Sequence, residues 1–172
     1  MAGMLNRLAA LATLIAVLAV PSTALAQGKT GPRGLDACSI VTKAELEAAL
    51  KRPMQSRQVP PSTPASLGVS HCMWASANGR QTLSVTTYTP DALARTQTKT
   101  LAIYYDSLKT SNANNAGRPA QVLPGIARHA SFFPGAGTAS TVLVHRNDFI
   151  VVIHLPGLSK EEATAVAKAA GN

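Results

Sequence analysis

The fold is indicated most clearly by residues 69–88, which read VSHCMWASANGRQTLSVTTY. Two runs of alternating apolar and polar residues flank Asn78-Gly79, a dipeptide that favours a two-residue type I′ turn because both turn residues need positive φ. The sequence therefore predicts a β-hairpin. Because side chains alternate across a strand, one face of the hairpin is expected to belong to the core. The residues on that face are Cys72, Trp74, Leu83 and Val85.

The opposite face of the hairpin is more polar. It carries His71, Met73, Thr82, Ser84 and Thr86. Imidazole and thioether groups are copper ligands, so His71 and Met73 raise the hypothesis of a copper site. Two ligands on one strand are too few to establish such a site, and we predict no bound metal.

The last third of the chain predicts three further strands, at residues 130–133, 138–146 and 149–155. Asn147-Asp148 supplies a tight turn between the last two. Both faces of that pair are mostly apolar, so this part of the sheet is expected to be covered on both sides. One face holds Val142, Val144, Phe149, Val151 and Ile153, and the other holds Leu143, His145, Ile150, Val152 and His154.

Two capping boxes predict the starts of helices, TKAE at residues 42–45 and SKEE at residues 159–162. The first helix is expected to end near Arg52 because Pro53 follows it. The second is expected to end at Gly171. The buried residues should be Leu46, Ala49 and Leu50 in the first helix, and Ala163, Val166, Ala167 and Ala170 in the second.

A third helix is predicted to begin at Thr89-Pro90-Asp91, where an N-cap residue is followed by proline and an acid. It is expected to run to about Lys109, followed by an Asn-rich loop at residues 111–117. Residues 59–68 are rich in proline and are expected to form a surface loop after a short edge strand. Antiparallel hairpins interleaved with helices predict an α+β fold with a mostly antiparallel sheet, an α/β sandwich, in one domain over residues 35–172.

Residues 1–26 have the layout of a secretory signal peptide. Arg7 precedes an apolar run without charges at residues 8–20, and small residues end the segment. Cleavage is expected between Ala26 and Gln27. An uncleaved N-terminal anchor is the main alternative, although the run is shorter than the roughly 20 residues that a membrane-spanning helix needs; a buried core helix is another.

The mature protein is therefore expected in the periplasm or outside the cell, with a flexible lead-in at residues 27–34. A lipoprotein is a further alternative, since residues 35–38 loosely resemble a lipidation site. The charge of Asp36 and its distance from the apolar run oppose it.

The two cysteines, Cys38 and Cys72, are expected to form a disulfide, because two thiols of a small exported domain usually pair. Such a bridge would contribute roughly 3–4 kcal/mol in the chain-entropy model. A metal-binding pair or a redox-active pair is the alternative, but neither has the C-x-x-C spacing that favours it.

The chain carries a net charge of +8, and its basic residues are scattered. A solvated cationic surface explains this distribution, and attraction to an anionic envelope component is the functional alternative. Another envelope protein is an equally open partner. Nucleic acid is not expected, because aromatic residues do not interleave with a basic stripe. Contact with a membrane is expected only if the leader is uncleaved.

No catalytic grouping is apparent in the sequence. There is no G-x-S-x-G elbow, and no phosphate loop or dinucleotide fingerprint that would indicate a cofactor. His145 and His154 should share a face but lie roughly 13 Å apart at ~3.3 Å per residue, too far for one metal ion. The four histidines, His71, His129, His145 and His154, are expected to be isolated, hydrogen-bonded or on the surface. We therefore predict a binding or accessory module, and an enzyme with a site assembled from distant residues is the alternative.

A set of ordered motifs resembles a broad group of small exported bacterial domains of unknown function, many of them actinobacterial lipoproteins. The motifs are Asp36-x-Cys38-Ser39-Ile40-Val41-Thr42, Cys72-x-Trp74, Leu83-x-Val85 and Leu123-Pro124-Gly125-Ile126, followed by paired strands and a helix. The resemblance implies a bridge between the cysteines and a sandwich of the PsbP/Mog1 type, and it implies no catalytic residues. This chain differs from the group in lacking a lipidation cysteine after the leader.

Overall fold

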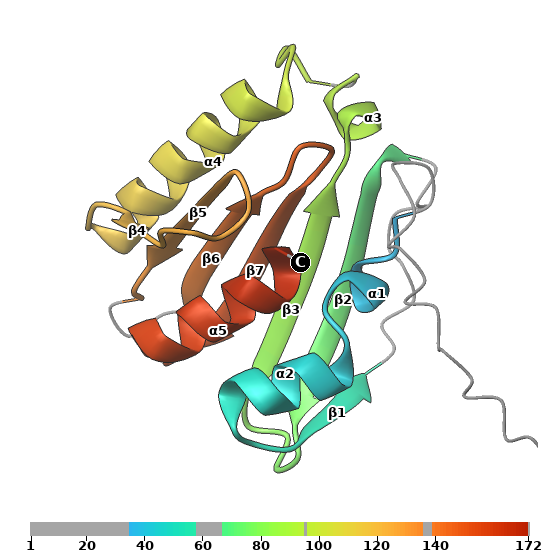
Figure 1. Cartoon of the computed structure of the whole chain (residues 1–172), viewed down its shortest axis with the longest axis vertical. Helices are drawn as coiled ribbons and strands as arrows, with labels where there is room; N and C mark the ends of the chain where they lie inside the picture. The colour runs from blue at the N-terminus through green and yellow to red at the C-terminus, as the bar shows by residue number, and fades with distance from the viewer. Residues whose placement is uncertain (1–34, 58–66, 95, 136–138, 172) are drawn as a thin grey trace, which may run out of the picture.

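A single antiparallel sheet organises the computed structural model, which describes residues 35–57, 67–94, 96–135 and 139–171. The order of its strands is β1-β2-β3-β7-β6-β5-β4 (Figure 1). The strands are β1 (Met54–Arg57), β2 (Val69–Ser76), β3 (Thr82–Tyr88), β4 (Gln121–Val122), β5 (His129–Phe133), β6 (Ala139–His145) and β7 (Ile150–Pro156). The helices are α1 (Ala37–Ile40), α2 (Lys43–Leu50), α3 (Pro90–Leu93), α4 (Leu101–Ala116) and α5 (Lys160–Gly171). The fold is thus α+β, as predicted.

The β2–β3 hairpin has the predicted register, in which Cys72 pairs with Val85 and Trp74 with Leu83. The predicted two-residue type I′ turn is wrong. The Ser76 amide donates to the Gln81 carbonyl (2.9 Å), and this last bond of the hairpin encloses a loop of four residues, 77–80. In this loop only Gly79 has positive φ. The observed loop is longer than the predicted turn by one residue on each side, so the residues of the two strands still pair as predicted.

The loop is built by side chains that the dipeptide rule does not consider. The Asn78 Oδ1 atom accepts from the Arg80 amide (3.1 Å) and from the Ser76 hydroxyl (2.6 Å). The Gly79 amide donates to the Ser76 carbonyl (2.8 Å). These bonds stabilise the wider loop in place of the tight one.

One face of the sheet is covered by α1, α2 and α5, of which α2 and α5 cross in front of the strands in Figure 1. Both predicted capping boxes are present, with Thr42 and Ser159 accepting from the amides of Glu45 and Glu162. The first helix ends at Leu50 rather than Arg52, because Lys51 turns the chain with φ 51°. The predicted core residues of the hairpin, of the β6–β7 pair and of α5 are all buried here.

The other face is covered in part by α4, and the long helix predicted from Pro90 is wrong. The chain forms two helices, α3 and α4, because threonines interrupt it: the Thr96 hydroxyl donates to the Leu93 carbonyl (3.1 Å), and Thr100 caps α4. The predicted loop at residues 111–117 is also wrong, since most of it belongs to α4, which ends at Gly117 (φ 61°). The apolar cluster on this face includes Leu93, Leu101, Tyr105, Phe133, Leu143, Ile150 and Val152.

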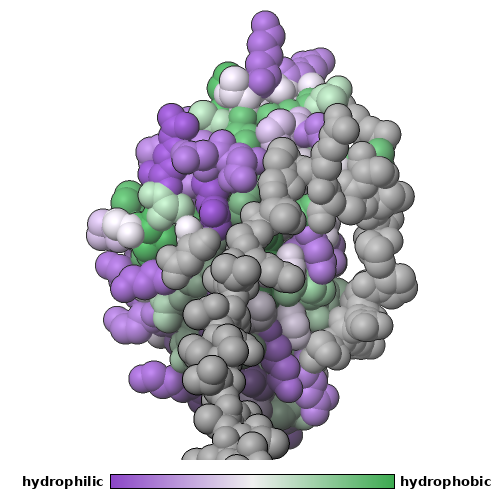
Figure 2. Space-filling view, turned by 45° about the vertical axis from the view of Figure 1, so that its right-hand side comes forward, coloured by the Kyte–Doolittle hydropathy of each residue, from purple (hydrophilic) through white to green (hydrophobic). Residues whose placement is uncertain are grey.

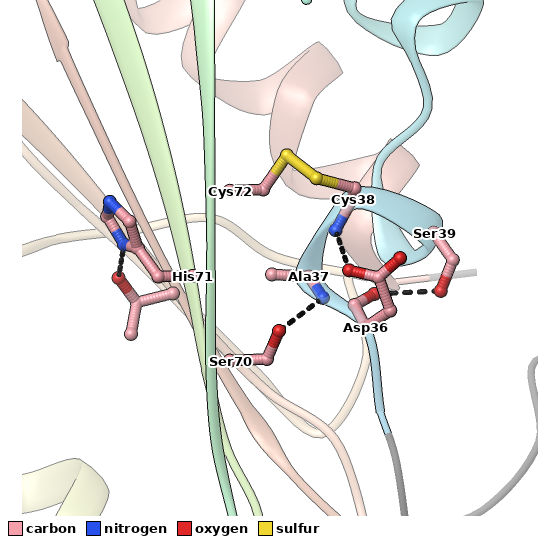
Figure 3. The surroundings of a disulfide bond; sticks show 8 residues. Asp36, Ala37, Cys38, Ser39, Ser70, His71 and Cys72 are labelled. Carbon is pink, nitrogen blue, oxygen red and sulfur yellow. Dashed lines mark hydrogen bonds between the residues drawn. A yellow bond between two sulfur atoms is a disulfide. The ribbon is translucent and has the colours of Figure 1, made fainter. Parts of the chain in front are cut away.

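The disulfide between Cys38 and Cys72 is confirmed, with 5.2 Å between the Cα atoms (Figure 3). It joins β2 to α1, a helical turn that the sequence did not predict. Asp36 caps that turn by accepting from the Cys38 amide (2.9 Å), and the Ala37 amide donates to the Ser70 hydroxyl (3.0 Å). The core side of β2 is therefore fastened covalently and by hydrogen bonds.

Several predictions concern residues that lie partly or wholly outside the described part of the chain. β1 confirms the short edge strand before the proline-rich loop, of which residues 59–66 lie outside the described residues. The predicted leader, its cleavage site between Ala26 and Gln27, and the lead-in at residues 27–34 also lie outside them. Across the described part of the chain, every helix is too short or too polar to cross a lipid bilayer.

Candidate functional site

The break between α3 and α4 opens a pocket of about 780 Å³, here called the α3–α4 pocket. It lies where these helices meet the turn that follows β6. One part of its lining is apolar and consists of Pro90, Leu93, Ala94, Leu101 and Ala102. The other part is polar and consists of Thr98, Lys99, Thr100, Arg128, His145 and Asn147.

A glycine outside the pocket positions its α3 wall. Gly68 precedes β2 with φ 73°, and its carbonyl accepts from the Thr89 amide (2.8 Å) at the start of α3. A Cβ atom at Gly68 would clash with the Ala92 amide nitrogen and would lie 2.7 Å from the Thr89 hydroxyl. Only glycine permits both this backbone conformation and this close approach.

His145, the last residue of β6, lines the pocket and is only 2% exposed. Its Nδ1 atom is buried and makes no hydrogen bond with any described residue. The ring stacks on Tyr105 (5.3 Å between centroids), whose hydroxyl is held by Ser131 (2.8 Å). The imidazole is thus fixed in position while one of its nitrogens lacks a partner.

Burial lowers the pKa of His145, and the charges of Arg128 and His129 lower it further, whereas the carboxylate of Asp106 acts in the opposite direction without reversing the shift. The ring is therefore neutral near pH 7. A neutral imidazole has one nitrogen that donates and one that accepts. His145 can accordingly hydrogen-bond a ligand without carrying a charge itself.

Among the described lining residues, the charged ones are Lys99 and Arg128, and both are cationic. Lys99 and Arg128 are exposed. The Arg128 amide donates to the His145 carbonyl (3.1 Å), and this bond holds the backbone of Arg128 beside the end of β6. No carboxylate is among the described residues that line the pocket. Such a lining favours an anion.

The first turn of α4 adds a second positive element. Leu101 and Ala102 line the pocket, and the positive end of the helix dipole lies at their amides. Thr100 uses its hydroxyl to accept from the Ile103 amide (3.3 Å), so that amide is already occupied. The helix start, Lys99 and Arg128 therefore bring positive charge to the same opening.

A second cavity of about 390 Å³ adjoins the first, and Arg128 and Asn147 line both. Arg146 also lines it, with its guanidinium 4.8 Å from the ring centre of Phe149. The cationic character of the α3–α4 pocket thus continues past Arg128.

The structure brings two of the four histidines together and gives each of the other two a threonine partner. His129 and His145 pair across β5 and β6 with their ring centres 5.8 Å apart. His129 lies on the surface, as one of the expected alternatives, whereas the prediction is wrong for His145, which is buried against other rings. His71 bonds Thr86 (2.9 Å), and His154 bonds Thr141 (2.8 Å), as hydrogen-bonded histidines were expected to do. Figure 3 shows His71 on the side of β2 opposite the disulfide.

The described residues contain no cluster of three His, Cys, Asp or Glu side chains that could hold a metal ion. The rings of His71 and His154 each bond a threonine, His71 on β3 and His154 on β6. On the described surface visible in Figure 2, hydrophilic and hydrophobic residues are interspersed in small areas. The α3–α4 pocket is therefore the more distinctive feature.

No protein-family model matches this chain, and neither does any curated protein or solved structure. The sequence did not predict the pocket. The run of threonines at residues 96, 98 and 100 was the one available signal, since such residues favour caps and turns over helix interiors. The functional proposal rests on the α3–α4 pocket.

Proposed function

We propose that this protein is a binding module of the cell envelope that holds a small anion in the α3–α4 pocket. The observation that carries the proposal is the lining of this pocket, where Lys99 and Arg128 bring positive charge beside His145, a buried side chain whose Nδ1 atom has no partner among the described residues. A buried polar atom without a hydrogen bond costs about 1–3 kcal/mol. A ligand oxygen that reaches this atom, after a small movement of the groups that cover it, would offset the cost.

The size of the pocket supports a small ligand. Its volume of about 780 Å³ falls within the range of roughly 300–1,000 Å³ that is usual for small-molecule sites. Lys99 and Arg128 supply charge, and Arg128 can bind a carboxylate through two parallel hydrogen bonds. No described lining residue is acidic, so none of these residues repels an anion through a negative side chain.

Export is part of the proposal. A leader at residues 1–26 and a disulfide between Cys38 and Cys72 both suit an oxidising compartment, the periplasm or the medium. The N-terminus of the exported protein tests this: Gln27 supports release, whereas Met1 contradicts it. We further propose that the helices on the two faces of the sheet make the α/β sandwich implied by the family resemblance.

Binding can be tested by following the amide signals of Leu101 and Ala102 in two-dimensional NMR spectra while acetate or inorganic phosphate is added. We expect saturable shifts that Arg128→Gln weakens about tenfold, since a charge-assisted hydrogen bond contributes roughly 1.5–3 kcal/mol. Arg80→Gln is the matched control, because it removes an equal charge from the exposed loop of the β2–β3 hairpin. Absence of saturable shifts would contradict the proposal.

The alternative is an enzyme whose site is assembled from distant residues. One observation favours it: a neutral imidazole, which has one nitrogen that can accept a proton, lines the pocket at His145. Turnover of a chromogenic ester tests this alternative, with His145→Gln as the variant. Turnover that is saturable and disappears in His145→Gln would favour the enzyme, whereas equal background rates would favour the binding module.

A further inference from the structure

The α3–α4 pocket is divided chemically, and the division points to the class of its ligand. Lys99, Arg128 and the first turn of α4 bring positive charge, whereas Pro90 and Leu93 of α3 present apolar surface. We propose that the ligand is an aliphatic monocarboxylate, with its head group at the cationic part and its chain along the apolar part. This inference rests on the proposed function and specifies its ligand.

The apolar part requires an explanation that a bare anion does not give. Leu93 and Leu101 belong to the apolar cluster beneath α4, yet both also line the pocket. Exposed Ala94 extends this surface to the opening. Inorganic phosphate would leave these groups in contact with water, whereas an aliphatic chain would cover them.

The polar part of the pocket matches a single planar head group with a negative charge. Arg128 offers the two parallel donors that match a carboxylate, and the amides of Leu101 and Ala102 lie at the positive end of α4. His145 supplies a neutral ring with an unpartnered buried nitrogen. A neutral aliphatic alcohol would satisfy the histidine but would leave the cationic groups unpaired.

The experiment measures binding of acetate, butyrate, hexanoate and octanoate to the intact folded protein by NMR titration and calorimetry. Octanol supplies the chain without the charge, and inorganic phosphate supplies the charge without the chain. Affinity is expected to rise by up to about fourfold per methylene group, which corresponds to ~0.8 kcal/mol. Octanoate should bind more tightly than either octanol or phosphate.

Ala102→Glu locates the site without weakening the fold. An acid in the first turn stabilises a helix, but here it places a carboxylate where the ligand head group should lie. Octanoate binding should be lost in Ala102→Glu and retained in Ala102→Gln, which has nearly the same size without the charge. Ala94→Glu should weaken octanoate far more than acetate, since Ala94 lies on the apolar wall.

The outcomes distinguish this inference from the proposed function. If acetate and phosphate bind as tightly as octanoate, the monocarboxylate inference is wrong while the proposed anion site stands. If octanol binds as tightly as octanoate, the charge does not contribute to binding, and both the inference and the proposed anion site are wrong. If no probe shifts the pocket signals, both are wrong. Octanoate binding that is unchanged in Ala102→Glu would place the ligand elsewhere and would overturn both.

Discussion

The two faces of the sheet are built differently. The face under α1, α2 and α5 is closed by apolar packing, two capping boxes and the disulfide between Cys38 and Cys72. The face under α3 and α4 is covered by an interrupted helical layer and contains the α3–α4 pocket, with a buried histidine nitrogen that lacks a partner. The first face, here called the closed face, has the contacts that stabilise the fold. The second, here called the open face, has the features of a binding site.

The disulfide tests the closed face and should have the largest effect. Replacing both Cys38 and Cys72 with alanine should lower the free energy of unfolding by about 3–4 kcal/mol in urea titrations, because the unfolded chain gains freedom. Binding of octanoate by the folded protein should be unchanged. A variant as stable as the parent, or one that folds but no longer binds, would contradict the division between the two faces.

Gly68 tests the wall of the pocket. Gly68→Ala should cost about 2–4 kcal/mol, which combines the left-handed backbone penalty with displacement of α3. Gly79→Ala is the matched control, because Gly79 has a similar φ of 68° but nothing within 4 Å of an added Cβ atom. It should cost only about 1–2 kcal/mol. Equal losses in urea titrations would show that Gly68 does not support α3 in this way.

The helix caps compare the two faces directly. Thr42→Ala removes the capping box of α2 on the closed face and should cost about 1–2 kcal/mol. Thr100→Ala removes a single 3.3 Å bond at α4 beside the pocket and should cost about 0.5 kcal/mol. The reverse order in thermal or urea unfolding would contradict the assignment of stability to the closed face.

Acid should weaken the fold through the open face. Burial lowers the pKa of both His145 and His154, so each folded value lies below the ordinary 6.5. As the pH falls through 6.5 toward the folded values, the unfolded chain binds protons first, and the free energy of unfolding decreases. His145→Gln and His154→Gln should each reduce this slope in urea midpoints measured across that range. A slope that neither variant changes would contradict the prediction.

Local patterns predicted the closed face well. Alternation placed Cys72 and Trp74 in the core, and capping boxes located the starts of α2 and α5. The disulfide was predicted from the expected oxidising compartment and from the number of cysteines. These features depend on neighbouring residues or on one long-range pair, so a single sequence contains enough information to predict them.

The open face depends on packing that the sequence does not display. The Asn-rich segment at residues 111–116 is helical in the structure, because Ala113 and Ala116 pack against the apolar cluster and override weak propensity. The meeting of His129 with His145 requires the β5–β6 register, which no clear turn motif specifies. The pocket itself joins residues from the α3–α4 break, the start of β5 and the end of β6.

The ring nitrogen signals of His145 provide the most direct measurement of the central claim. In protein labelled with nitrogen-15, octanoate should shift the His145 ring signals saturably while those of His71 and His154 remain in place, because their Nδ1 atoms already bond threonines. Unchanged His145 signals at saturating octanoate, or equal shifts in all three rings, would contradict the account.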